Sequence, residues 1–430
     1  MDKIFIEGPN QLFGKVSISG AKNAALPILA SSLLAKNTSI FKNIPKLGDV
    51  KTILILLKHL GVQVEVTQDA IKLCSDAVQR FEAPYDLVKT MRASILVLGP
   101  LIARFHRAVV SLPGGCAIGQ RPVNLHLDAL QKLGAEIKLQ NGYVYAKSKR
   151  LIGTKIKFES VTVTGTENIM MAATLAKGGT QIVNAACEPE VIDLANALNA
   201  MGARISGAGT RVIEVEGVEA LQGVNYSVMS DRIEAGTFLI AVSATGGDVL
   251  IQNCNPKYLS AAIDVLKKAG VKIQEQVSSM RVQSNGDLTA IKVETEPYPG
   301  FPTDLQAQLM AMLTQANGKS VIYENIFENR FNHVAEMQRM GAKIRIQDHK
   351  AHIFGKTPLT GAPLMATDLR ASASLVIGGL VAKGRTEISR VYHLDRGYEA
   401  LEEKLKVLGA NIFRQKEGKE VANAERVSFL

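Results

Sequence analysis

The sequence predicts an α/β protein of two domains, each built from three repeated units with buried helices and outer sheets. Three observations predict it: a helix-to-strand motif that occurs six times, a nearly apolar helix upstream of each copy, and a length of 430 residues, which suits two or three domains. Hydrophobic residues make up 47% of the chain and charged residues 21%, as in folded globular proteins rather than disordered ones.

The repeated motif is an amphipathic run that ends at a glycine and continues into a short apolar strand. Its apolar residues recur at every third and fourth position, which is helical spacing. A glycine after the last turn adopts the left-handed conformation that a Cβ atom resists. The motif returns about every 70 residues, as in repeat architectures. Its glycines are Gly61, Gly134, Gly202, Gly270, Gly341 and Gly409.

A second helical stretch, apolar on almost every face, precedes each copy of the motif. Such a helix is normally buried inside a domain. Because these stretches are rich in small residues, we expect two closed groups of three repeats rather than an open solenoid, with the seam near Val228 to Asp231. The residues after Phe413 resemble a polar tail. The apolar stretches are residues 23–35, 90–103, 168–176, 232–244, 305–316 and 369–382.

Composition narrows the class of protein. The first residues lack the apolar segment of a secretory signal, and no run is long enough to span a membrane. The cysteines are far apart and form no CxxC pair, so neither a zinc site nor a disulfide framework is expected. The net charge of +10 fits anionic partners: nucleic acid, a membrane surface or a phosphorylated small molecule. The cysteines are Cys74, Cys116, Cys187 and Cys254.

Charged and polar residues gather just before the buried helices and in the loops before the surface helices. If several helix starts face one cleft, their unpaired N–H groups and nearby cations make an anion site. For Asp304 a simple helix cap is the favoured interpretation. Arg370 enters an apolar helix, so an internal ion pair and a functional site both stay open.

The most unusual segment is SLPGGCAIGQRPVNLH, residues 111–126. Glycines and prolines surround Cys116, and Arg121 lies close by in sequence. Exposure and cationic neighbours tune thiol reactivity, so either a reactive Cys116 or a turn that merely contains a cysteine is possible. The composition also suits a lid over a ligand, and the segment lacks the P-loop pattern.

Seven stretches resemble one family: SGAKNAALPIL, APYDLVKTMRAS, SLPGGCAIGQRPVNLH, TDLQAQ, FENRF, ATDLRASASLV and HLDRGYE. They resemble the bacterial UDP-N-acetylglucosamine enolpyruvyl transferases, in the family's order, from residue 1 to about residue 413. The resemblance implies two inside-out α/β barrel domains, with residues 21–229 in the first and residues 1–20 plus 230–430 in the second.

The resemblance also implies an activity. Enolpyruvyl would pass from phosphoenolpyruvate to the 3′-hydroxyl of UDP-N-acetylglucosamine with release of phosphate, through a tetrahedral intermediate, in the cytoplasm, as the first committed step of peptidoglycan synthesis. It implies no metal, no cofactor, no nucleic-acid partner and no membrane insertion. The residues leave the oligomeric state open, with a monomer as the working expectation.

The same resemblance assigns roles to residues. Cys116 matches the proton donor to C3 of phosphoenolpyruvate, and Asp304 matches a carboxylate beside the sugar hydroxyl that acts as a base or as an orienting group. Arginine forks suit the phosphate and carboxylate groups. The residues that the resemblance assigns to these groups are Lys22, Asn23, Arg121 and Arg396, with Arg330 and Arg370 nearby. The nucleotide sugar is expected at Arg92, Arg121, Pro122, Val123, Asn124, Leu125, Ser160, Val161, Thr162, Val163, Asp304 and Ile326.

Two positions depart from the family's pattern. Asn124 stands where many members have Asp, and Gly48 stands where some have a second Lys, so substrate affinity is expected to shift while activity is retained. Cysteine at position 116 predicts alkylation by the epoxide fosfomycin.

Three alternatives are weaker. The cysteine-containing loop argues against a shikimate-pathway transferase, and the presence of Cys116, Asp304 and Arg396 argues against a silent nucleotide-sugar binder. A nucleic-acid binder would show a clustered basic stripe with aromatics, whereas aromatics are 5% of the chain and the basic residues are dispersed among the repeats.

Overall fold

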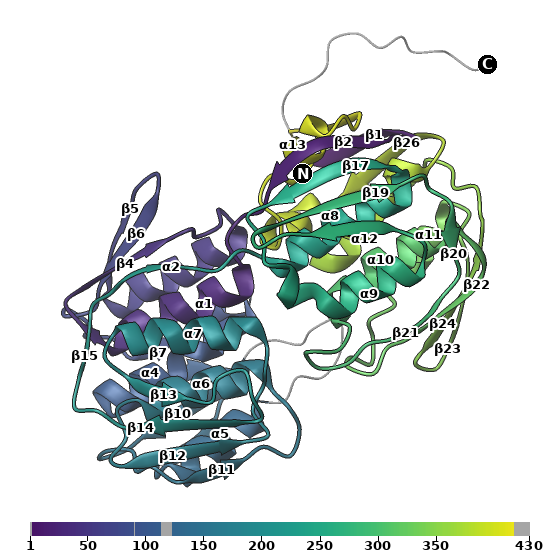
Figure 1. Ribbon diagram of the computed structural model, residues 1–430. Helices are drawn as coiled ribbons and strands as arrows, with labels where there is room; N and C mark the ends of the chain where they lie inside the picture. Colours follow the sequence, from purple (N-terminus) through teal and green to yellow (C-terminus); the bar gives the residue numbers. More distant parts are fainter. Residues whose placement is uncertain (1, 90, 113–122, 417–430) are drawn as a thin grey trace.

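The computed structural model describes residues 2–89, 91–112 and 123–416 and forms two lobes, each with its own hydrophobic core (Figure 1). The core of the first lobe runs from Ala21 to Val228. The core of the second lobe combines Ile4 to Ile18 with Ile233 to Ile412. On this separation we propose residues 21–229 as one domain and residues 1–20 plus 230–430 as the other.

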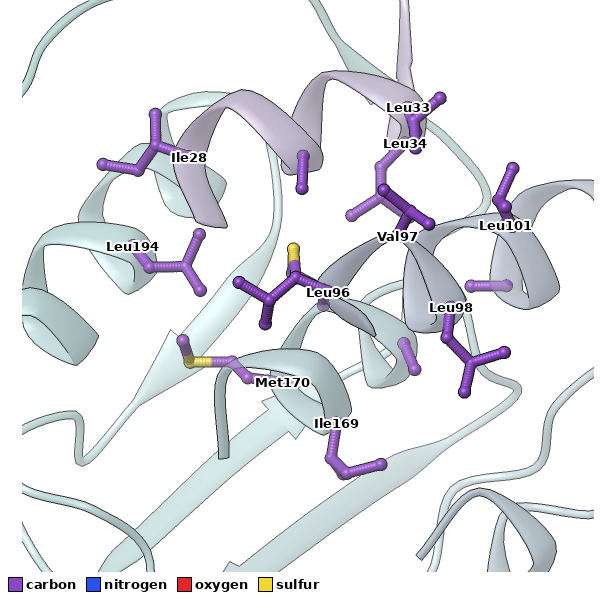
Figure 2. Close-up of a cluster of buried hydrophobic side chains, with 14 of the residues drawn as sticks. Ile28, Leu33, Leu34, Leu96, Val97, Leu98, Leu101, Ile169, Met170 and Leu194 are labelled. Carbon is purple, nitrogen blue, oxygen red and sulfur yellow. The ribbon is translucent and has the colours of Figure 1, made fainter. Parts of the chain in front are cut away.

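The nearly apolar stretches form helices in the middle of each lobe, as predicted. Helix α8 is buried along almost its whole length, and α10 packs against both α8 and α12. Figure 2 shows the equivalent arrangement in the first lobe, where Ile28, Leu96, Met170 and Leu194 meet from different helices. The central helices are α1 (Lys22–Ser31), α4 (Leu98–Phe105), α6 (Val163–Ala173), α8 (Arg232–Thr245), α10 (Gln306–Leu313) and α12 (Leu369–Val381).

The repeated motifs form the more exposed helices, and each helix is closed by a left-handed glycine, at the C-cap in α2 and directly after the C-cap in the other five. All six glycines have φ between 92° and 104°, which confirms the repeat and its cap. These helices are α2 (Gly48–Leu60), α5 (Asn124–Lys132), α7 (Pro189–Ala200), α9 (Ser260–Lys268), α11 (Val334–Arg339) and α13 (Leu401–Val407). Shorter helical segments are α3 (Tyr85–Val88), η1 (Ser32–Leu34), η2 (Arg92–Val97), η3 (Pro256–Leu259), η4 (Thr303–Leu305) and η5 (Val391–Arg396).

Sheets form the outer layer of both lobes. In the first lobe the four-stranded sheets have the orders β16-β4-β6-β5, β7-β8-β10-β9 and β11-β12-β14-β13, and β15 pairs with β3. The strands are β3 (Ala35–Lys36), β4 (Thr38–Lys42), β5 (Gln63–Val66), β6 (Ala70–Cys74), β7 (Glu82–Ala83), β8 (Arg107–Ser111), β9 (Glu136–Gln140), β10 (Tyr143–Lys147), β11 (Lys155–Lys157), β12 (Gly179–Val183), β13 (Arg204–Ser206), β14 (Val212–Glu216), β15 (Leu221–Gln222) and β16 (Asn225–Ser227).

The second lobe has the sheets β25-β26-β1-β27, β18-β19-β17-β2 and β20-β22-β24-β23, with β21 also paired to β22. The strands are β1 (Lys3–Gly8), β2 (Leu12–Ser17), β17 (Gly247–Gln252), β18 (Lys272–Glu275), β19 (Ser279–Ser284), β20 (Leu288–Thr289), β21 (Lys292–Glu294), β22 (Ala316–Tyr323), β23 (Lys343–Gln347), β24 (Lys350–Gly355), β25 (Pro363–Met365), β26 (Gly384–Ser389) and β27 (Ile412–Gln415).

Both ends of the described chain belong to the second lobe. Strand β1 pairs with β26 and β27, and β2 pairs with β17. The prediction of a polar tail from residue 414 is wrong at its first residues, because β27 continues to Gln415. Arg414 there forms ion pairs with Asp395 and Glu402. No helix in the described ranges is long and apolar enough to cross a membrane.

Candidate active site

A partly exposed carboxylate held by two buried arginines is the centre of the site in the second lobe. Asp304 lies in η4, before α10, and its Oδ1 and Oδ2 accept hydrogen bonds from Nη2 of Arg330 and Nη2 of Arg370, both at 2.8 Å. Both arginines are almost fully buried. Burial alone would raise the pKa of Asp304, but the charges of Arg370 and Arg330 outweigh it and hold that pKa below its ordinary value. Asp304 is therefore an ionised carboxylate.

This geometry corrects the interpretation of Asp304 as a helix cap. The N-cap position of η4 is Pro302, and no side chain caps that helix. The side chains of Asp231 and Asp368 do cap α8 and α12 through backbone N–H groups. For Arg370 the sequence left open an internal ion pair or a functional site. The structure shows the internal ion pair, with Asp304 as its partner.

A second ionic cluster joins the two lobes. Lys22 is the first residue of α1, Asp49 lies in the first turn of α2, and Arg396 ends η5 of the second lobe. The Asp49 carboxylate accepts from Lys22 Nζ at 3.3 Å and from Arg396 Nε at 2.8 Å. Sequence reasoning missed Asp49; its position in a helical first turn looks like ordinary compensation of the helix dipole.

The two clusters are close enough to influence each other electrostatically. Burial lowers the pKa of Lys22, Asp49 opposes that effect, and the charge of Arg370 lowers the pKa further. Lys22 in turn helps to lower the pKa of Asp304. The structure therefore brings together Lys22, Asp304, Arg330, Arg370 and Arg396, five residues that the sequence placed in widely separated segments.

Gly48 lies beside the arginine that crosses between the lobes. A Cβ atom at this position would lie 3.6 Å from Cγ of Arg396, which is an ordinary van der Waals contact. The backbone therefore leaves room for a side chain at position 48, and nothing in the structure requires glycine there.

Most of the described residues expected at the nucleotide sugar lie on or beside three neighbouring elements of the first lobe, whereas Asp304 and Ile326 lie in the second. Arg92 begins η2, Asn124 begins α5, and Thr162 caps α6 by accepting from the Gly165 N–H at 3.2 Å. The side chains of Val123, Leu125, Val161 and Val163 pack against the core of that lobe.

His126 and Asn168 tie these elements together. Asn168 Oδ1 accepts from Gly99 N at 2.7 Å, and its Nδ2 lies 3.1 Å from His126 Nδ1. Because that amide nitrogen is a donor, Nδ1 is the acceptor and the proton of the ring is on Nε2, which faces Thr164 at 3.4 Å. Burial, followed by the charge of Arg92, lowers the pKa of His126 to about 4. His126 is thus neutral and ties α5 to α6, and Asn168 ties α6 to η2 by donating to the Ile95 carbonyl at 3.1 Å.

Three other residues expected at the substrates, Asn23, Ser160 and Ile326, lie outside the two ionic clusters and the His126 and Asn168 contacts. Asn23 is half-buried in α1 and Ser160 is exposed before α6. Ile326 follows β22, and its N–H donates to Glu324 Oε1 at 3.0 Å. Cys116, Arg121 and Pro122 lie outside the described residues. Within the described ranges, no group of three or more His, Cys, Asp or Glu side chains is arranged to hold a metal ion.

A buried ion pair lies where the chain passes from the first lobe to the second. Arg232, at the start of α8, donates from Nε to both oxygens of Glu190 in α7, at 2.9 and 3.2 Å. Both side chains are almost fully buried. Arg232, which the sequence grouped with the other helix-start charges, therefore connects the lobes.

Known proteins give a consistent comparison. A family model described as EPSP synthase (3-phosphoshikimate 1-carboxyvinyltransferase) matches residues 6–405. A UDP-N-acetylglucosamine 1-carboxyvinyltransferase of Thermodesulfovibrio yellowstonii is 59% identical over 97% of this chain and 100% of its own length. One of Myxococcus xanthus is 56% identical over the same shares.

Solved structures share the fold. The enolpyruvyl transferase NikO from Streptomyces tendae has a TM-score of 0.87 at 24% identity, over 96% of this chain and 98% of its own. EPSP synthase from Acinetobacter baumannii has a TM-score of 0.74 at 19% identity, over 97% of this chain and 100% of its own. The predicted enolpyruvyl transferase fold is confirmed. With relatives this similar over nearly their full length, the chain belongs to the UDP-N-acetylglucosamine 1-carboxyvinyltransferase family of transferases.

Proposed function

We propose that this protein transfers the enolpyruvyl group of phosphoenolpyruvate to the 3′-hydroxyl of UDP-N-acetylglucosamine and releases phosphate. The observation that carries the proposal is the ionised Asp304 between Arg330 and Arg370, with Lys22 of the other lobe in electrostatic range. This arrangement offers fixed positive charge to an anionic substrate and a carboxylate to a hydroxyl group.

The cations of both lobes would hold phosphoenolpyruvate. Arginine forks suit its phosphate and carboxylate, and positive charge fixed in advance stabilises a charged intermediate. Nε of Arg370 is buried with no hydrogen-bond partner in the described part of the chain. We propose that this N–H donates to phosphoenolpyruvate when the substrate binds. Arg121, from the loop that contains Cys116, completes this group in our proposal, together with Asn23.

The reaction would proceed by addition and then elimination. In the addition, the 3′-oxygen bonds to C2 of phosphoenolpyruvate while C3 receives a proton from the Cys116 thiol. In the elimination, C3 returns a proton to the Cys116 thiolate, the bond from C2 to the phosphate oxygen breaks, and the proton taken from the 3′-hydroxyl leaves with the phosphate. Because a carboxylate with a lowered pKa is a weak base, we propose that Asp304 mainly orients the 3′-hydroxyl and accepts its proton only as the bond to C2 forms.

The nucleotide sugar would lie along the α5, α6 and η2 elements. Arg92, Asn124 with Leu125, and the 160–163 segment are aligned there by His126 and Asn168, and Val123, Pro122 and Ile326 are assigned to the same substrate. Asn124 keeps hydrogen-bonding capacity but supplies no negative charge. We place the reaction in the cytoplasm, consistent with the free thiols of Cys74, Cys187 and Cys254.

Phosphate release tests the proposal directly. It is measured from phosphoenolpyruvate with UDP-N-acetylglucosamine, with shikimate 3-phosphate, and with neither. We expect release only with the nucleotide sugar. Release with shikimate 3-phosphate would favour the activity named in the family model's description, and folded protein that releases none would contradict both.

Cys116→Ser tests the proton donor. Turnover should fall by at least about 100-fold, the scale of a lost general acid, while calorimetric binding of UDP-N-acetylglucosamine stays within about twofold. Cys74→Ser is the control, because that thiol lies outside the proposed site. Unimpaired turnover in Cys116→Ser would remove this residue from the mechanism.

A further inference from the structure

We propose that the outward face of the sheet β20-β22-β24-β23, with β21 beside it, is a docking surface for an anionic phospholipid membrane. The face gathers cations from four adjacent strands and has a single carboxylate, Glu294. Successive residues of a strand point to opposite sides. Exposure alternates accordingly in β21 and β24, whereas β22 and β23 each contain three consecutive exposed residues. We name this surface the basic face; its cations are Lys292, Lys319, Lys343, Arg345 and Lys350.

The strand register brings these charges side by side. Phe354 of β24 lies between Lys319 of β22 and Lys343 of β23. In the next outward row, His352 lies between Val321 and Arg345. The sequence suggested that basic residues were dispersed among the repeats. Within this repeat, sheet pairing brings Lys319, Lys343, Arg345 and Lys350 onto one face.

Most of these cations have no carboxylate partner. Lys292 pairs with Glu294 at 3.1 Å, whereas the other four form no ion pair with any described residue. On the outer faces of other sheets, several cations have carboxylate partners, whereas Lys138, Lys147 and Lys155 of the first lobe form no ion pair with a described residue. Examples of the paired cations are Lys3 with Glu387, Arg385 with Glu7, Arg281 with Asp248, and Lys72 with Glu65. The basic face therefore keeps an uncompensated charge that a partner could neutralise.

The titration of His352 agrees with a positive potential on the face. Partial burial lowers its pKa, and the charges of Lys319, Arg345 and Lys350 lower it further. These are cations of the basic face itself, so their fields add at its middle.

Two features favour lipid headgroups over nucleic acid. Single-stranded nucleic acid binds where bases can stack on free aromatic rings. Here the ring of Tyr323 is half-buried, with Lys292 and Lys350 at 4.6 and 5.1 Å from its centre. Phe354 is 41% exposed, with Lys319 5.5 Å from its ring centre, and a single exposed ring offers no platform for successive bases. A lipid surface needs only clustered Lys and Arg side chains at the same level, which the sheet provides.

The position of the sheet also suits peripheral binding. Figure 1 shows β22, β23 and β24 at the edge of the second lobe that is turned away from the first lobe. The basic face could thus contact a membrane while the cations shared between the lobes keep their access to substrate. No described helix could insert across the bilayer, so the attachment would be electrostatic and reversible.

Vesicle co-sedimentation of the full chain tests the proposal. We expect binding to vesicles of phosphatidylcholine with phosphatidylglycerol, little binding to phosphatidylcholine alone, and weaker binding at high salt. The triple variant Lys343→Gln, Arg345→Gln, Lys350→Gln should partition roughly tenfold to hundredfold less, given the usual contribution of each cation near an anionic surface. Its phosphate release should be unchanged, which also reports that it folds.

A matched variant removes the same charge from the first lobe. Lys138→Gln, Lys147→Gln, Lys155→Gln should bind vesicles within about twofold of the parent protein. Equal losses in both triple variants would overturn the proposal in favour of a general net-charge attraction. Absence of binding to phosphatidylglycerol, or face-dependent binding of a labelled uridine oligonucleotide in its place, would also overturn it.

Discussion

Arg396 of the second lobe donates from Nε to the Asp49 carboxylate of the first lobe at 2.8 Å. The same carboxylate accepts from Lys22 Nζ at 3.3 Å. One buried acid therefore holds two cations that we assign to phosphoenolpyruvate. Without it, Lys22 and Arg396 would repel each other, and Arg396 would lose its only anchor on the first lobe among the described contacts.

Asp49→Asn should weaken the use of phosphoenolpyruvate. We expect kcat/KM for phosphoenolpyruvate to fall on the order of 10- to 100-fold, because misplaced binding groups lose that much. Binding of UDP-N-acetylglucosamine should change by less than about twofold, since Asp49 lies apart from the elements assigned to it. Steady-state kinetics and calorimetry measure the two effects. Asp248→Asn, which breaks an exposed pair with Arg281, is the control; an equal loss there would show that Asp49 has no special role.

Asp304→Asn should impair both stability and turnover. Arg330 and Arg370 are almost fully buried, and removing the shared partner leaves two buried charges uncompensated, at a cost of about 3 kcal/mol in the free energy of unfolding. Turnover should fall at least about 100-fold. Urea unfolding and phosphate release measure the two effects. Full turnover in this variant would exclude Asp304 from both the basic and the orienting role.

The neutral state of His126 makes stability depend on pH. Its pKa is about 4 in the folded chain against an ordinary 6.5, so the unfolded chain binds the proton first as the pH falls. The free energy of unfolding should therefore drop by about 3 kcal/mol between pH 6.5 and pH 4 and level off below that. His126→Gln should remove this component, measured as the difference between the two proteins in urea unfolding at each pH. His333, whose pKa is also lowered to about 4, contributes equally in the parent protein and in His126→Gln. If the free energies of unfolding of the two proteins change in parallel with pH, His126 is not the source of the pH dependence.

The left-handed glycines that close the repeat helices allow a matched pair of substitutions. Gly202→Ala meets nothing within 4 Å, so it should cost only the left-handed backbone penalty, about 1 kcal/mol. At Gly61 a Cβ would also lie 2.9 Å from the carbonyl oxygen of Ala77, so Gly61→Ala should cost about 1 kcal/mol more. Thermal or urea unfolding ranks the two. Equal costs would mean that the turn containing Ala77 shifts without penalty.

Local patterns in the sequence predicted the elements well because they arise from neighbouring residues. Helical spacing and the cap glycines reveal the six repeats, and the structure confirms both. Ion pairs are different. Asp304 is 26 residues from Arg330 and 66 from Arg370, so its sequence context resembled a helix cap. Asp49 and Arg396 are 347 residues apart, and no local pattern could indicate their contact.

The sequence by itself determined the repeat, the buried helices and the set of residues that resemble an enolpyruvyl transferase, because periodicity and motif order are properties of the chain. Only the tertiary structure decided which charges meet: Asp304 with two arginines, Asp49 with cations of both lobes, and the unpaired cations of the basic face. The reason is physical. A buried charge needs a partner, and which partner it finds depends on how distant segments pack rather than on its neighbours in sequence.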